Sequence, residues 1–300
     1  MRITLTGASG FIGHRLIERL LQRKHTLHLL GRKRPTNLPP SVQFSGWDAT
    51  SGNTPPVEAL HNAEAIIHLA GEPVAQRWTP AVKQRIRTSR VDGTQALLGA
   101  IAQLPVKPQT FIAASAIGYY GDRGEELLPE TASPGTGFLP EICIAWEGAS
   151  NAARSQGIRT VPLRIGIVLG PDGGALAKMI TPFRLGAGGK IGSGRQWMSW
   201  IHADDAVGLI LHALETTSLQ GPMNVTAPNP VRNTDFTRAL GHALHRPTLI
   251  PVPEFGLKLV FGEMATMLTS SQRVDCAAAR HSGYRFQFPD LGTALANLFA

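Results

Sequence analysis

The first half of the chain alternates short apolar runs with longer segments of helical periodicity. The short runs are typical of buried strands, and the longer segments carry hydrophobic residues three or four positions apart. Strands that alternate with helices predict a parallel sheet joined by right-handed crossovers. The expected elements are strands at Arg2–Thr6, Thr26–Leu30, Ala65–Leu69, Thr110–Ala114 and Thr160–Leu169, and helices at Pro80–Ala102 and Pro140–Gln156.

The pattern changes after Gly170, where glycines crowd residues 171–194 and three helical segments separated by prolines follow. These segments are Ala203–Glu215, Asn233–His245 and Phe255–Met267. We therefore expect an α/β fold in which residues 1–170 form a Rossmann domain with a doubly wound parallel sheet. Residues 171–300 are expected to form a smaller, mostly helical part that covers the substrate, with some strands returning to the sheet.

A glycine-rich turn with the sequence GASGFIG joins the first strand to the first helix. Gly7 permits the tight turn, Gly10 lets the backbone approach a pyrophosphate, and Gly13 permits close packing of helix on strand. The phosphates then face free N–H groups and the positive end of the helix dipole. A plain glycine turn is the alternative, but the place between strand and helix favours a dinucleotide site. The expected contacts are Gly7, Ser9, Gly10, Phe11, Ile12 and Gly13.

The residues after the second strand indicate which dinucleotide binds. Proteins that bind NAD usually have an acidic side chain here, which holds the ribose 2′-hydroxyl. This chain has Gly31-Arg32-Lys33-Arg34 instead, and Arg32 and Lys33 could neutralise a 2′-phosphate. A solvated basic loop is the alternative, yet it leaves the missing acid unexplained. The sequence therefore favours NADP(H) as the cofactor.

Composition and charge narrow the remaining classes of partner. Hydrophobic residues make up 43% and charged residues 17%, as in soluble globular proteins. No apolar run approaches the about 18 residues that cross a bilayer, and no histidine pair has metal-ligand spacing. The net charge of +8 suits small anions or nucleic acid, but the basic residues are scattered and form no nucleic-acid motif. We expect a small-molecule substrate, no metal, and no nucleic-acid or membrane partner.

The chain has two cysteines, Cys143 and Cys276, which lie far apart in the sequence. Isolated cysteines without a metal-ligand pattern are typical of reduced thiols in the cytoplasm. We therefore expect a cytoplasmic protein. Its oligomeric state is expected to be a monomer or a homodimer.

Seven short motifs are spread along the chain: LAGE, RW, GYYG, WE, GGAL, PFRLG and GSGxQ…WIH. They are found at Leu69–Glu72, Arg77-Trp78, Gly118–Gly121, Trp146-Glu147, Gly173–Leu176, Pro182–Gly186 and Gly192–His202. Together they resemble the extended short-chain dehydrogenase/reductases, and more narrowly their atypical epimerase-family branch. The resemblance covers nearly the whole chain and implies a seven-stranded parallel sheet with NADP(H) in its groove. The segment from about residue 250 resembles the branch's own C-terminal extension.

The catalytic pair of that superfamily has no counterpart in this chain. Active members are expected to use a Tyr, and four residues later a Lys that lowers the Tyr pKa and holds the nicotinamide ribose. Counted back from Glu147, these positions are Leu139 and Cys143. Leucine has no exchangeable proton, and cysteine carries no positive charge. The Ser or Thr that assists the Tyr aligns near Ala116, with Ser115 beside it.

Other side chains near the expected cleft are therefore candidates for binding and chemistry. Arg90 replaces the Asn of extended members and could reach the cofactor phosphates. The other expected cofactor contacts, after the third strand, are Leu69, Ala70 and Gly71. The candidate proton donors are Glu72, Tyr119 and Tyr120; a Tyr with a pKa near 10 needs a nearby cation to act as a base at neutral pH. The candidates for the substrate pocket are Ser115, Gln196 and Trp200.

Two classes of function follow from these residues. The main hypothesis is an NADP(H)-dependent oxidoreductase that acts on a small, unidentified substrate by hydride transfer. The alternative is a non-catalytic protein that binds NADP(H) and senses its redox state, which the losses at Leu139 and Cys143 favour. Sugar-nucleotide epimerisation is a weaker alternative, because Met198 stands where such enzymes clamp the diphosphate with an Arg, although Arg195 is close by.

Overall fold

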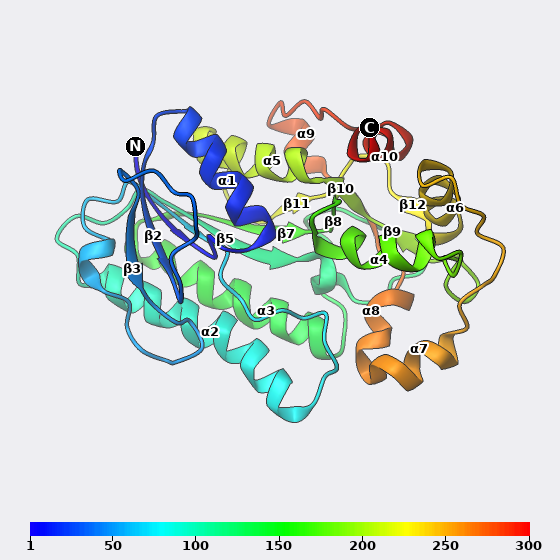
Figure 1. The fold of residues 1–300 in the computed structure, drawn as a ribbon. Coiled ribbons are helices and arrows are strands. Elements are labelled where there is room, and N and C mark those ends of the chain that lie inside the picture. Colours follow the sequence, from blue (N-terminus) through cyan, green and yellow to red (C-terminus); the bar gives the residue numbers. More distant parts are fainter.

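The computed structural model describes all 300 residues as an α/β fold built on one large sheet (Figure 1). The sheet has seven strands, and every neighbouring pair is parallel. From edge to edge the strands are β11 (Met223–Val225), β7 (Arg159–Ile165), β5 (Thr110–Ala116), β4 (Ala65–His68), β1 (Arg2–Thr6), β2 (Thr26–Gly31) and β3 (Gln43–Gly46). The strand order reverses between β1 and β4, where doubly wound sheets bind their ligands. The predicted fold class is confirmed.

Helices cover both faces of this sheet. α1 (Phe11–Gln22) and α5 (Ala203–Glu215) pack against each other on one face (Figure 1). α2 (Pro80–Ala102) and α3 (Phe138–Asn151) pack against each other on the opposite face. The cleft at the strand ends is therefore framed by helices from both layers.

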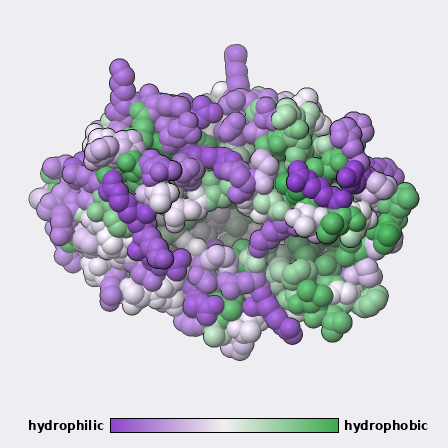
Figure 2. Space-filling view, in the orientation of Figure 1, coloured by the Kyte–Doolittle hydropathy of each residue, from purple (hydrophilic) through white to green (hydrophobic).

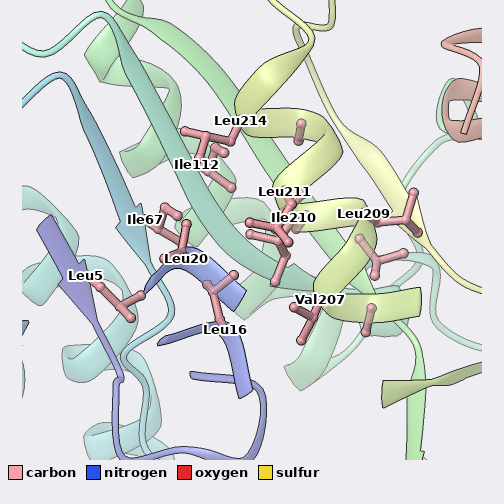
Figure 3. Close-up of a cluster of buried hydrophobic side chains, with 14 of the residues drawn as sticks. Leu5, Leu16, Leu20, Ile67, Ile112, Val207, Leu209, Ile210, Leu211 and Leu214 are labelled. Carbon is pink, nitrogen blue, oxygen red and sulfur yellow. The ribbon is translucent and has the colours of Figure 1, made fainter. Parts of the chain in front are cut away.

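The largest part of the core lies between the sheet and the layer formed by α1 and α5. Apolar residues three and four positions apart give α1 one stripe that faces the sheet, and its Leu16 and Leu20 are fully buried. Figure 3 shows this cluster, in which the two leucines lie among side chains of the sheet and of α5: Leu5, Ile67, Ile112, Ile210 and Leu211. Burying a side chain of this size contributes about 1.5–3 kcal/mol. This packing fixes the position of α1 on the sheet.

The remaining chain forms short strand pairs and small helices at one end of the large sheet (Figure 1). β8 pairs with β10 and β6 with β13 in parallel, and β9 pairs with β12 antiparallel. These strands are β6 (Leu127–Leu128), β8 (Ile167–Gly170), β9 (Trp197–Met198), β10 (Trp200–His202), β12 (Val231–Arg232) and β13 (Arg273–Val274). The helices are α4 (Gly174–Arg184), α6 (Asn233–Ala243), α7 (Glu254–Phe261), α8 (Thr266–Thr269), α9 (Ala277–His281) and α10 (Leu291–Phe299). Single 3-10 turns are η1 (Val57–Ala59), η2 (Ile117–Tyr120), η3 (Ala152–Gln156) and η4 (Gly262–Ala265).

Two predicted elements were wrong in extent, each because of one glycine. The strand expected over Thr160–Leu169 divides at Gly166, where a Cβ would lie 2.6 Å from the carbonyl oxygen of Ser199. β8 consequently leaves the large sheet and pairs with β10. The helix expected over Phe255–Met267 ends at Gly262, whose φ of +62° is left-handed.

Other boundaries differ by smaller amounts. Two strands of the large sheet, β3 and β11, were not predicted, and neither were the strands of the short pairs other than β8. The helix expected from Pro140 runs over Phe138–Asn151 and continues as η3. β3 and β11 were missed because both strands are short, and because most residues of β3 are polar or glycine. Together with α5, β11 shows that part of the chain after residue 170 returns to the large sheet.

The C-terminal segment presents an apolar surface. α7 has no buried residue, and the loop before it is also exposed. Figure 2 shows the apolar side chains of this region at the lower right of the molecule. The exposed residues are Leu249, Ile250, Phe255, Leu259 and Val260. None of the helices combines the length and the apolarity needed to cross a bilayer.

The turn after β1 requires glycine for two separate reasons. Gly7 has a φ of +73°, in the left-handed region that disfavours other residues. A Cβ at Gly7 would also lie 2.6 Å from the carbonyl carbon of Leu69, and one at Gly13 would collide with the carbonyl oxygen of Gly7. The turn, the start of α1 and the end of β4 are thus in direct backbone contact.

We expect a Gly7→Ala substitution to lower the free energy of unfolding by about 2 kcal/mol or more, because it adds both backbone strain and a collision. Gly99 is the matched control, since it lies inside α2 and an added Cβ meets nothing within 4 Å. Gly99→Ala should raise the free energy of unfolding by about 0.5–1 kcal/mol. Urea unfolding measures both changes, and equal effects of the two substitutions would contradict this account.

Candidate functional site

A cleft opens at the carboxyl ends of β1, β4 and β5. Figure 2 shows a hollow in the middle of this face, and Figure 1, in the same orientation, places it between the start of α1, α3 and α4. Doubly wound sheets bind ligands in such a crevice, outside the strand ends where the order reverses. The predicted cofactor contacts of the turn and of the loop after β4 lie in the two connections that meet here.

The start of α1 is open to an anion. Gly10 caps the helix with extended backbone, no side chain accepts a hydrogen bond there, and the first turn carries no acidic residue. The N–H groups of this turn therefore lack side-chain acceptors and carry the positive end of the helix dipole. Ser9 and Gly10 are exposed, so a diphosphate could approach the backbone directly. The glycine turn fits the phosphates of a dinucleotide.

Phe11 joins this turn to the loop after β8. Its ring lies against Gly170, Gly173 and Gly174, where any Cβ would meet it at close range. The guanidinium of Arg15 lies 4.3 Å from the centre of the same ring and pairs with Asp172. The side chain of Phe11 is thus used for packing, and its backbone remains available to the cofactor.

The basic residues after β2 are free for an anionic ligand. Arg32 and Lys33 are exposed, and neither forms an ion pair or a side-chain hydrogen bond within the protein. Arg34 differs, because its Nη2 donates to the carbonyl oxygen of Val42 at 3.0 Å. Arg32 and Lys33 therefore present two unpaired positive charges at the carboxyl end of β2, at one side of the cleft.

A buried chain of hydrogen bonds holds the loop after β4. The N–H of Ala70 donates to Thr6 Oγ1 at 3.1 Å, and Thr6 Oγ1 lies 2.7 Å from His68 Nδ1. On the other side of the ring, His68 Nε2 lies 3.1 Å from Thr94 Oγ1, whose hydroxyl donates to the carbonyl oxygen of Arg90. These contacts are mutually consistent when Thr6 donates to Nδ1 and Nε2–H donates to Thr94. Burial lowers the pKa of His68 to about 4, so the ring is neutral.

Arg90 lies at the inner edge of the same loop. A Cβ on Gly71 would be 3.2 Å from its guanidinium carbon, and Nη1 donates to the carbonyl oxygen of Glu72 at 2.9 Å. The guanidinium also stacks over Trp146 of α3, 4.9 Å from the ring centre. Burial lowers the pKa of Arg90 to about 10, which leaves it charged at neutral pH.

Glu72 lies in the loop between β4 and α2 and is anchored to that helix. Its N–H donates to Ser89 Oγ at 2.9 Å, and its carboxylate accepts from Gln76 Nε2 at 3.2 Å. The carboxylate also lies 3.4 Å from Arg85 Nε. The carboxylate of Glu72 is thus engaged in structural contacts, which argues against a role as proton donor.

The two tyrosines after β5 have different surroundings. Tyr120 is fully buried; its hydroxyl donates to Asn224 Oδ1 at 2.8 Å and accepts from Arg164 Nη1 at 2.9 Å. Burial raises the pKa of Tyr120 to about 12. These contacts argue against Tyr120 as a proton donor. Tyr119 is half-buried, its hydroxyl has no partner in the protein, and the guanidinium of Arg164 lies 3.5 Å from its ring centre.

Three residues expected near the substrate are enclosed by the protein. Ser115 is 3% exposed and donates to Glu147 Oε1 at 2.7 Å, while Glu147 forms two 2.9 Å bonds with Arg164. Trp200 is fully buried, and its Nε1 donates to the carbonyl oxygen of Asn229 at 3.0 Å. Gln196 is buried and donates to the carbonyl oxygens of Ile191 and of Leu268 in α8. All three side chains are engaged within the protein, so their place at a substrate pocket stays a prediction.

Comparison with known proteins places these features in a family. The sequence model of the NAD dependent epimerase/dehydratase family matches residues 3–226, and that of a domain of unknown function matches residues 252–298. Epimerase family protein YfhF of Bacillus subtilis is 39% identical over 100% of this chain and 98% of its own length. The chain belongs to the NAD dependent epimerase/dehydratase family. The resemblance inferred from the seven motifs is confirmed.

Solved structures of family members share the fold. Human epimerase family protein SDR39U1, solved with NADPH, is 34% identical with a TM-score of 0.88, over 100% of this chain and 99% of that one. A nucleoside-diphosphate sugar epimerase of Corynebacterium glutamicum is 33% identical with a TM-score of 0.80, over 100% of this chain and 58% of that one. UDP-glucose 4-epimerase of Thermotoga maritima, at 21% identity and a TM-score of 0.80, shares the fold.

In this epimerase-family chain, Leu139 lies among apolar side chains, whereas the thiol of Cys143 lies close to Ser115 and Arg90. Burial raises the pKa of Cys143 to about 12, so its thiol is neutral. Leu139 packs against a cluster that contains Trp78 and Ile142. The same cluster includes Met264, from the segment that the second family model matches. Leu139 therefore belongs to an apolar wall, the cluster with Trp78, Ile142 and Met264, at the position of the superfamily's Tyr. A neutral thiol takes the position of the Lys.

We expect the buried His68 to make stability depend on pH. Between pH 6.5 and about 4, an unfolded chain takes up a proton that folded His68 does not, so the free energy of unfolding falls as the pH falls. In a His68→Gln variant this loss should be smaller by about 3 kcal/mol. Urea unfolding at several pH values measures it, with His61→Gln, at an exposed position, as the control. The same pH dependence in all three proteins would refute the neutral, buried state of His68.

Proposed function

We propose that this epimerase-family protein binds NADP(H) across the carboxyl ends of β2, β1 and β4. The observation that carries the proposal is the glycine turn, whose backbone is bare at the start of α1 and accepts no side chain at Gly7 or Gly13. Such a turn suits the diphosphate. The human relative solved with NADPH supports the same cofactor here.

The selection of NADP(H) over NAD(H) rests on Arg32 and Lys33. Both are exposed and unpaired at the end of β2, where a 2′-phosphate would lie. Two cations that gain an anionic partner strengthen binding through charge-assisted hydrogen bonds.

An Arg32→Ala variant should bind NADPH about tenfold more weakly and NADH with unchanged affinity, because only NADPH carries the 2′-phosphate. Isothermal titration of both nucleotides measures the difference. Arg87→Ala, an exposed position on α2, is the control and should change neither affinity. Equal affinities of the unaltered protein for NADPH and NADH would argue against the proposed selection.

We further propose that the protein is an oxidoreductase that acts on a small carbonyl or enone substrate. Bound NADPH supplies a hydride to the substrate carbon. Tyr119 donates its hydroxyl proton to the oxygen that becomes negative, and the phenolate regains a proton from solvent. Tyr119 is suited to this step because its hydroxyl has no partner in the protein and is free to bond to the substrate oxygen.

A Tyr119→Phe variant should lose about 100-fold or more in kcat and keep its affinity for NADPH. The oxidation of NADPH, followed by absorbance across a panel of carbonyls and enones, measures turnover. Tyr120→Phe is the matched control: it should lower the free energy of unfolding by about 1–3 kcal/mol, through loss of a buried hydrogen bond, and keep kcat. Full activity of the Tyr119→Phe variant would exclude Tyr119 as the proton donor.

A second function, non-catalytic binding of NADP(H), is favoured by the apolar wall of Leu139 and the neutral thiol of Cys143. In that case NADPH would bind with the predicted selectivity and no member of the substrate panel would be turned over. The two functions therefore differ in turnover and agree in binding.

A further inference from the structure

Arg90 carries a positive charge that no carboxylate of the protein balances. Arg85 pairs with Glu72 and Arg164 pairs with Glu147, whereas Arg90 forms no ion pair. Its Nη1 donates to two backbone carbonyls, those of Glu72 and Ile86, and its Nε and Nη2 have no acceptor in the protein. A half-buried cation in this state is destabilised until a ligand supplies the missing partner.

The strand order places this charge beside one half of a bound dinucleotide. If the 2′-phosphate lies by Arg32 after β2 and the diphosphate lies at the start of α1 after β1, the other half extends over β4 and β5. Neighbouring strands are about 4.8 Å apart. The nicotinamide half, which would pass β4 and reach β5, therefore covers about two strand spacings. Arg90 touches Gly71 after β4 and Trp146 of α3, and α3 packs on β5. Its guanidinium therefore lies on the nicotinamide side, beyond the phosphates.

One carboxylate acts on Arg90, that of Glu72: it raises the pKa of Arg90, but it also pairs with Arg85. Cys143 lies on α3 one turn before Trp146, and its buried thiol is neutral. The carboxylate of Glu72 is directed to Gln76 and Arg85, and that of Glu147 is held by Arg164. The nicotinamide end of the cleft consequently has a net positive charge.

We propose that Arg90 makes the site bind NADPH more tightly than NADP⁺. The oxidised nicotinamide ring is positively charged and the reduced ring is neutral, so a fixed cation nearby destabilises only the oxidised form. A site with this preference stabilises the reduced cofactor before the reaction and releases the oxidised one after it, which suits reduction of the substrate. The inference rests on the proposed binding of NADP(H) and adds to it a direction of reaction.

The experiment compares three ligands: NADPH, NADP⁺ and 2′-phosphoadenosine 5′-diphosphate, which has the phosphates and lacks the nicotinamide half. Isothermal titration gives their affinities for the unaltered protein and for Arg90→Gln. The unaltered protein should bind NADPH on the order of tenfold more tightly than NADP⁺. In Arg90→Gln the ratio should fall to about two or less, with the affinity for 2′-phosphoadenosine 5′-diphosphate unchanged.

Two control variants separate charge from shape. Arg90→Lys keeps the positive charge and should keep most of the preference for NADPH. Arg87→Gln removes an exposed arginine of the same helix that forms no ion pair, and it should leave the ratio unchanged. Binding of 2′-phosphoadenosine 5′-diphosphate also shows that each variant is folded.

Several outcomes would overturn the inference. A ratio near one in the unaltered protein does so without any variant. A ratio unchanged by Arg90→Gln does so as well, and an equal loss of affinity for all three ligands would instead place Arg90 at the cofactor phosphates. Failure of the unaltered protein to bind any of the three ligands is a different result, because it contradicts the proposed function itself.

Discussion

The candidate site depends on the direct backbone contact between the turn after β1 and the end of β4. Gly7 takes a left-handed conformation, and its Cα lies so close to Leu69 that no side chain fits between them. This contact aims the start of α1 into the cleft and leaves the backbone bare where an anion would lie. On the β4 side, hydrogen bonds run from Thr6 through His68 to α2, the helix that carries Arg90. One close approach thus positions both the bare start of α1 and the loop that Arg90 contacts.

The sequence was sufficient to predict the fold, because the signals for it lie in neighbouring residues. The alternation of apolar runs and helical segments is a local signal, and so is the GASGFIG turn at the end of the first strand. The basic residues Arg32 and Lys33 follow the second strand directly. Their position beside the cleft then follows from the parallel order of β1 and β2.

The interior of the site could not be predicted in the same way, because its contacts join distant parts of the chain. His68 bonds to Thr6, 62 residues away, and Tyr120 bonds to Asn224, 104 residues away. The histidine at the end of β4 and the arginine in β7 were visible in the sequence, but their partners were not. Trp200 was a candidate for the substrate pocket because it belongs to the GSGxQ…WIH motif; in the fold, the packing of the second part of the chain covers it. Burial of this kind is a property of the whole fold.

These features describe a protein whose glycine turn is open to an anion, whereas the catalytic pair of its superfamily is replaced by Leu139 and Cys143. Binding is therefore the central claim, and titration of the purified protein with NADPH by calorimetry tests it most directly. The account predicts saturable binding of one NADPH per chain, with a matching rise in the temperature of unfolding. Absence of heat and of stabilisation with NADPH, NADP⁺ and NADH alike would contradict it.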